Sequence, residues 1–224
     1  LQLLRVAYMN VKDANPRAKV ILGGMAFWWD NDWGRAPYLL ALMEVLKNDR
    51  NRERFDNYFD IVAVHTYGNP LNAYAIPMLA REWLSARALR KPIWIMESNV
   101  VPFDDPVQLL PPGHMRATLD EQASFVIQSF AMGIAAGVER QAIYKMVDED
   151  SEGGQYYGLV RNDGTTRPAY TAYQVAATYF SDVKSAYYTW PGLPGPASTS
   201  DIRKVLDSVQ GRHQFIWPDR KSTR

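Results

Sequence analysis

Glu97 is the side chain in this sequence whose position most clearly suggests chemistry. It ends the apolar run 91–97 (KPIWIME), and the polar residues Ser98 and Asn99 follow it. A short apolar run that begins at a proline and ends at polar residues predicts a buried strand. Parallel α/β enzymes place catalytic groups at the carboxyl ends of such strands. Glu97 is therefore a candidate catalytic carboxylate, and the alternative is a strand-end glutamate that pairs with a neighbouring loop.

Three further apolar runs also end in polar or aromatic residues. Because the carboxyl ends of parallel strands meet at one edge of a sheet, these residues are predicted to share a cleft with Glu97. Aromatic side chains are abundant in the chain, with 7 Trp and 13 Tyr, and their faces can stack on sugar rings as well as fill a core. The candidates are Trp28 and Trp29 after the first run, His65 and Tyr67 after the second, and Tyr144, Lys145 and Asp148 after the fourth.

The predicted elements that position these residues alternate regularly between strands and helices. Near-continuous apolar strands predict a parallel α/β sheet buried on both faces. Gly23-Gly24 follows a strand, but no dinucleotide-binding glycine fingerprint surrounds it, which argues against a doubly wound fold. We interpret the pair as room for close backbone packing. Strands are predicted over 18–24, 59–65, 92–97 and 141–147, helices over 1–15, 37–47, 73–88, 119–137 and 168–180, and loops over 27–34 and 98–115.

The composition excludes several functional classes. The chain has 224 residues and a formal net charge of +1, which predicts no attraction to nucleic acid or to an anionic membrane. It has no Cys, so disulfides, thiolate zinc sites and a cysteine nucleophile are excluded. No apolar run is long enough to cross a membrane. We predict no cofactor, since no cofactor motif is present, and no metal, since 148–150 (DED) lacks the calcium-loop spacing.

Several motifs follow one another across about residues 1–185, namely His65-Thr66-Tyr67, Ile95-Met96-Glu97, 157–161 (YGLVR), Asp163-Gly164 and Pro168-Ala169-Tyr170. In the order and spacing of these motifs the chain resembles the clan-A retaining glycoside hydrolases, which are TIM-barrel enzymes. The resemblance implies that the strands of this chain are strands five to eight, the C-terminal half of a (β/α)8 barrel. It also implies a carbohydrate substrate and a secreted or periplasmic location.

The resemblance also assigns roles to particular residues. A retaining glycosidase uses two carboxyl groups about 5 Å apart, one as nucleophile and one as acid/base. Glu97 matches the nucleophile, Tyr67 the tyrosine that donates a hydrogen bond to it, and His65 the histidine beside it. A core histidine bonded to a backbone carbonyl is the alternative for His65. Sugar contacts are expected from Trp28, Trp29, Asn99, Tyr144, Lys145 and Asp148, with a rim or solvated-loop role as the alternative for the two tryptophans, Asn99, Lys145 and Asp148.

The chain departs from the family pattern in one important respect. The acid/base glutamate of the clan belongs to strand four, which would precede Leu1. We therefore expect residues 1–189 to be half of a catalytic barrel in a longer polypeptide, completed by an upstream segment or a second chain. Residues 190–224 are expected to form a linker and the first strands of a β-sandwich. The alternative functions are a non-catalytic carbohydrate-binding barrel and a lyase or aldolase that uses Lys145.

Overall fold

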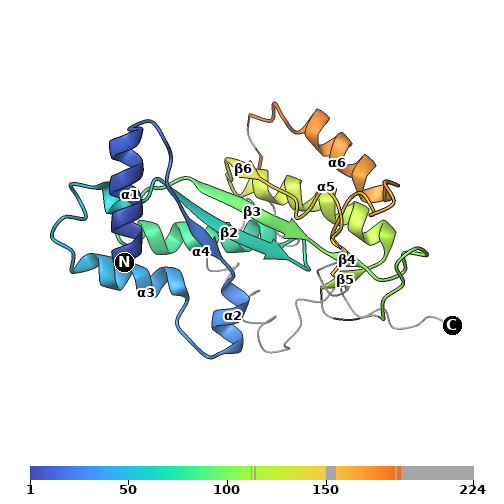
Figure 1. Ribbon diagram of the computed structural model, residues 1–224, viewed down its shortest axis with the longest axis horizontal. Helices are drawn as coiled ribbons and strands as arrows, with labels where there is room; N and C mark the ends of the chain where they lie inside the picture. The colour runs from blue at the N-terminus through green and yellow to red at the C-terminus, as the bar shows by residue number, and fades with distance from the viewer. Residues whose placement is uncertain (112, 114, 150–154, 185, 188–224) are drawn as a thin grey trace.

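The protein is built around a four-stranded parallel sheet (Figure 1). Its computed structural model describes residues 1–187 except 112, 114, 150–154 and 185, and the side chains of Trp28 and Asn31 are also outside the description. The strands lie in chain order, with β1 and β6 at the two edges. Their bounds are β1 Ile21–Met25, β2 Ile61–Tyr67, β3 Ile93–Asn99 and β6 Arg140–Gln141.

Helices connect the strands, as expected when consecutive strands are parallel. The arrowheads of β2 and β3 point towards a small two-stranded parallel sheet of β4 and β5 (Figure 1). The bounds are α1 Gln2–Ala14, α2 Phe27–Asp32, α3 Tyr38–Lys47, α4 Asn72–Ser85, α5 Leu119–Ala135 and α6 Pro168–Tyr179, a 3-10 helix Asp56–Tyr58, β4 Val101–Pro102 and β5 Arg116–Ala117.

The longest helix, α5, has its two ends fixed by local sequence. Thr118 and Glu121 form a reciprocal capping box, in which each side chain accepts a hydrogen bond from the backbone N–H of the other residue. After the helix, Gly137 adopts a φ of +69°, the left-handed conformation that glycine takes without steric cost. The predicted helix 119–137 is confirmed as Leu119–Ala135, with Ala136 as its C-cap and Gly137 directly after the cap.

The main core lies between the sheet and the helices α1, α3 and α4. Ile93 and Ile95 on β3 are completely buried, whereas Met96 on the other face of the strand is 38% exposed. This difference follows from the two-residue period of a strand, which alternates side chains between the faces. The helices α3 and α4 contribute Leu39, Leu42, Met43, Leu46, Ala80 and Leu84 to the buried side.

Two local predictions need correction. The predicted strand 141–147 pairs as a strand only at Arg140 and Gln141. Beyond them single hydrogen bonds continue along β3, from Ala142 N to Ile95 O and from Tyr144 N to Ser98 O, before the chain turns away. The predicted loop 27–34 contains the short helix α2, and β4 and β5 lie within the predicted loop 98–115 and just after it.

The remaining predictions of length and position hold where the structure describes them. All other predicted helices and strands occur within a few residues of their expected bounds. The predicted linker and sandwich strands at 190–224 lie outside the described residues. In the part of the chain that is described, no helix combines the length and the apolar character needed to span a membrane.

Candidate active site

Glu97 is the centre of a hydrogen-bonded cluster at the carboxyl ends of β2 and β3. Its Oε2 atom lies 2.8 Å from the Tyr67 hydroxyl and 3.0 Å from Nδ1 of His65. A register shift after Val64 places His65 directly opposite Glu97 and Tyr67 opposite Asn99. The structure therefore brings together the three residues that the sequence predicts as catalytic, and the bulge in the strand pairing aligns them.

The environments of Tyr67 and His65 both favour the uncharged side chain. Burial, reinforced by the hydrogen bond to Glu97, raises the pKa of Tyr67 far above its ordinary value, so the hydroxyl remains protonated and donates. Burial lowers the pKa of His65, against the opposing influence of the Glu97 charge. Nδ1 is the ring nitrogen of His65 that faces the carboxylate, 3.0 Å from Oε2 of Glu97.

Gly24 on the neighbouring strand β1 gives the His65 ring its space. A Cβ atom at Gly24 would lie 1.8 Å from Nε2 of His65, far inside van der Waals contact. At Gly23 the same atom would meet nothing within 4 Å. Close packing therefore occurs at Gly24 and not at Gly23, and the close neighbour is the side-chain ring beside the candidate nucleophile rather than backbone.

Replacing Gly24 by alanine is expected to turn the His65 ring away from Glu97. Overpacking of this kind costs about 1–3 kcal/mol of stability, and here the ring gives way because its Nε2 edge is the part in contact. NMR titration of the imidazole should show the pKa of His65 moving back towards the ordinary value. Gly23→Ala is the matched control and should leave the titration unchanged. An unaltered His65 titration in Gly24→Ala would contradict the packing argument.

A cleft of about 620 Å³ opens above Glu97. Four of its lining residues, Glu97, Tyr67, Trp29 and Tyr144, were predicted from the sequence as site residues. Others were not predicted, because they come from loops, from α2 or from the short strands β4 and β5, where no periodic pattern marks a direction. Among the described residues the lining is Trp29, Asp32, Tyr67, Glu97, Val101, Met115, Arg116, Tyr144, Gln155 and Tyr157.

Three tyrosines form one aromatic wall of this cleft. The ring centroids lie 5.4 Å apart for Tyr67 and Tyr157, 5.7 Å for Tyr144 and Tyr157, and 6.5 Å for Tyr67 and Tyr144, all with edge-to-face geometry. This is the favoured arrangement of aromatic rings, so the contacts hold the Tyr67 ring in place. Tyr157 belongs to the 157–161 motif, and that motif was the signal that could have marked it as a site residue.

Asn99 supports the cleft from beneath, which corrects its predicted role as a direct sugar ligand. The residue is completely buried. Its amide group donates to the backbone oxygens of Tyr144 at 2.8 Å and Tyr157 at 2.7 Å, and its own oxygen accepts from Val100 N. With all these groups engaged by the backbone, Asn99 fixes two members of the tyrosine wall rather than reaching into the cleft.

Asp148 also needs correction, because it belongs to a buried charge network behind the wall. It is 4% exposed, accepts a 2.7 Å hydrogen bond from Gly158 N and pairs at 2.7 Å with Arg167. Arg167 in turn pairs with Asp105 at 2.7 Å, and both side chains are fully buried. Asp105 also accepts from Arg161 at 2.8 Å. This network joins the loop after β4 to the segment that carries Tyr157.

The remaining predicted ligands occupy different positions around the cleft. Trp29 on α2 is half exposed and lines the cleft. The backbone of Trp28 lies in α2, but its side chain is outside the described residues. Lys145 follows the cis Tyr144–Lys145 peptide bond, and its ammonium pairs with Glu149 at 3.1 Å instead of lining the cleft. No group of three or more metal-ligating side chains occurs among the described residues.

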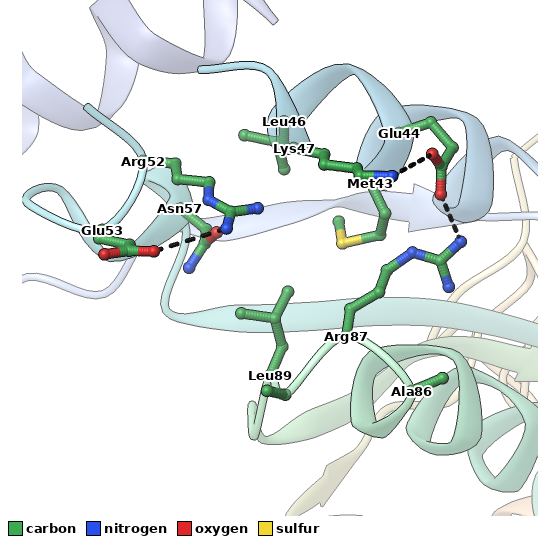
Figure 2. A pocket seen from close by; sticks show the side chains of 11 residues that line it. Met43, Glu44, Leu46, Lys47, Arg52, Glu53, Asn57, Ala86, Arg87 and Leu89 are labelled. Carbon is green, nitrogen blue, oxygen red and sulfur yellow. Dashed lines mark hydrogen bonds and ion pairs between the residues drawn. The ribbon is translucent and has the colours of Figure 1, made fainter. Parts of the chain in front are cut away.

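A second cavity, of about 610 Å³, lies away from Glu97 between the carboxyl ends of α3 and α4 (Figure 2). It adjoins the segments that precede β2 and β3, so it lies at the amino ends of these strands, opposite the end of the sheet that carries Glu97. Its apolar side includes Met43, Leu46 and Leu89, and most of its charges are paired with one another, as in Arg87–Glu44 at 2.7 Å. The carboxylates of this cavity, Glu44 and Glu53, are exposed and pair with lysine or arginine side chains, unlike Glu97.

Comparison with known proteins identifies the class of fold. No protein-family model and no curated protein sequence matches the chain. Among solved structures, a family 39 glycoside hydrolase from the gut symbiont Bacteroides cellulosilyticus WH2 has a TM-score of 0.56 at 16% identity, over 87% of this chain. The protein therefore has the fold of a glycoside hydrolase, with a parallel α/β sheet. It spans 39% of the length of that structure.

Two further solved structures are similar at lower scores. A β-1,3-glucanosyltransferase of Rhizomucor miehei matches with a TM-score of 0.48 and 15% identity, covering 75% of this chain and 56% of its own. A GH5_18 structure from Bifidobacterium longum matches with a TM-score of 0.43 and 15% identity, covering 70% and 43%.

Proposed function

We propose that this protein is part of a retaining glycoside hydrolase and that Glu97 is its nucleophile. The observation that carries the proposal is the Glu97 carboxylate, held at a cleft by the Tyr67 hydroxyl and His65 Nδ1. The Tyr67 hydroxyl donates to one carboxylate oxygen at 2.8 Å and His65 Nδ1 lies 3.0 Å from the same oxygen, so the two side chains fix the direction of the carboxylate. The glycoside hydrolase fold of the chain supports the same function class.

In this mechanism the ionised Glu97 attacks the anomeric carbon of a bound sugar. A bond forms between the carboxylate oxygen and that carbon while the glycosidic bond breaks and the leaving oxygen takes a proton from an acid/base carboxyl group. Water then hydrolyses the glycosyl-enzyme ester, with the second carboxylate acting as base. The Tyr67 hydroxyl and the adjacent His65 ring hold the direction of the Glu97 carboxylate through both steps.

The acid/base carboxyl group is proposed to lie upstream of Leu1, in a barrel half that this segment does not include. Among the described residues β1 pairs only with β2, so its other edge is open. Open strand edges pair readily with further strands. An upstream strand or a second chain on that edge would complete residues 1–189 as a barrel domain.

The stereochemistry of the product tests this proposal. The full-length polypeptide is incubated with a panel of aryl glycosides, and the first-formed sugar is followed by NMR. A retaining enzyme releases a product with the anomeric configuration of its substrate. Inversion would reject the double-displacement mechanism. Measurable sugar affinity without turnover would instead indicate a non-catalytic carbohydrate-binding barrel.

A further inference from the structure

A second aromatic groove adjoins the Glu97 cleft on the side of β1 and α2. Its volume is about 380 Å³. Trp29 lines both this groove and the Glu97 cleft, so the two are neighbours across a single side chain. The groove is lined by Leu22, Gly23, Gly24, Met25, Ala26, Trp29, Asp30, Trp33, Arg35 and Tyr38.

The rim of the groove exposes an unusual amount of aromatic surface. Trp29, Trp33 and Tyr38 are 50%, 61% and 57% exposed. Large aromatic side chains gathered at an exposed site mark a binding surface more often than scattered single residues do. Two of them form a continuous stack, since the Trp29 and Trp33 rings lie 5.4 Å apart with 29° between their planes.

Buried Asp30 holds this rim in a fixed arrangement. Its Oδ1 accepts from Nε and Nη2 of Arg35 at 3.2 and 2.8 Å, and its Oδ2 accepts from Tyr38 N at 2.8 Å. The Arg35 guanidinium lies 4.3 Å from the Trp33 ring centre, within cation–π range. A rim ordered before binding loses little entropy when a ligand arrives.

We propose that this groove is an accessory subsite for a glycan chain that extends from the Glu97 cleft. The proposal rests on the glycosidase function and adds that the substrate is an oligosaccharide or polysaccharide rather than a single terminal sugar. Sugar rings present apolar faces and hydroxyl groups, which match the aromatic rings and the polar edge of Arg35. Because Trp29 lines both the groove and the Glu97 cleft, a glycan in the groove continues into the cleft. This continuity favours the substrate over an unrelated protein partner as the occupant.

This subsite is compatible with a completed barrel. An upstream strand would pair along the edge of β1 and cover the part of the groove lined by residues 22–25, whereas α2 and the segment 33–38 lie beyond the carboxyl end of that strand. The aromatic rim therefore remains at the end of the sheet that carries Glu97.

Trp33→Ala in the full-length polypeptide tests the subsite. Gluco-, xylo- and manno-oligosaccharides of two and six units serve as substrates, and kcat/KM is measured for each. The wild-type protein is expected to prefer the hexasaccharide of its sugar series, and the variant to lose about tenfold more activity on the hexasaccharide than on the disaccharide. Tyr179→Ala is the control, since Tyr179 on α6 is 74% exposed and lines neither cavity.

An equal loss on both lengths, or no hexasaccharide preference in the wild-type protein, would overturn the subsite. Calorimetric binding of the same hexasaccharides to the Glu97→Gln variant separates this outcome from failure of the proposed function. If no wild-type turnover is found but Trp33→Ala weakens hexasaccharide binding, the groove binds glycan and only the catalytic proposal fails. Binding that Trp33→Ala does not weaken rejects the groove.

Discussion

Glu97→Gln is expected to lower kcat for an activated aryl glycoside about 10⁴-fold or more, because removing a nucleophile removes the covalent step itself. Glutamine keeps the size of the side chain, and its carbonyl oxygen can still accept from Tyr67. The unfolding midpoint should therefore stay close to that of the wild-type protein. Both quantities are measured on the full-length polypeptide.

Two further measurements make the Glu97 experiment specific. In Glu97→Ala, azide can occupy the vacated space and attack the anomeric carbon as the aryl oxide leaves, so added azide should restore turnover and give a glycosyl azide of inverted configuration. Glu53→Gln is the control, because Glu53 is an exposed side chain outside the cleft. Retained turnover in Glu97→Gln would reject Glu97 as the nucleophile.

Arg167→Met is expected to destabilise the fold by about 3–5 kcal/mol, because it leaves Asp105 and Asp148 as buried charges without this partner. Urea unfolding followed by tryptophan fluorescence measures the loss.

Burial alone would raise the pKa of Asp105, but hydrogen bonds from Arg161 and Arg167 outweigh it and hold the pKa below its ordinary value. The stability from this group is therefore present at neutral pH and is lost in acid, as the carboxylate takes up a proton.

Arg87→Met provides the matched comparison. Arg87 also pairs with a carboxylate, Glu44 at 2.7 Å, but the glutamate side chain is 57% exposed and remains solvated when its partner is removed. The change in unfolding free energy should be much smaller than for Arg167→Met. Similar losses in the two variants would show that burial does not set the strength of the Arg167 network.

The strands and most helices could be predicted because their causes are local. Apolar runs such as 59–65 and 91–97 (KPIWIME) mark buried strands, and Pro168 and Gly137 mark a helix start and a helix end. The region after Gln141 was predicted less well, because 142–147 (AIYKMV) has a strand pattern while regular pairing with β3 is limited to Arg140 and Gln141. There, side-chain bonds from Asn99 to Tyr144 O and Tyr157 O replace a regular ladder.

The candidate site divides in the same way. Glu97, His65 and Tyr67 could be named from the sequence, since parallel strands bring their carboxyl ends to a common edge. The sequence could not show that Asp148 and Asn99 are buried. Asp148 pairs with Arg167, and Asn99 bonds the backbone of Tyr144 and Tyr157, and in each case the partner lies many residues away in the sequence. Arg116, Gln155 and Tyr157 reach the cleft from the short strand β5 or from segments without periodic structure, and their direction follows only from packing.

By itself, then, the sequence determined the alternating α/β architecture and the carboxylate at the tip of the third strand, because both follow from short-range patterns. Only the tertiary structure decided three further features. The register shift after Val64 sets His65 opposite Glu97, Gly24 leaves room for the His65 ring, and the Tyr67 hydroxyl donates to Oε2 of Glu97. These contacts join residues of β1, β2 and β3, some of which are separated by more than thirty residues in the sequence. They depend on register and close packing, which no local pattern encodes.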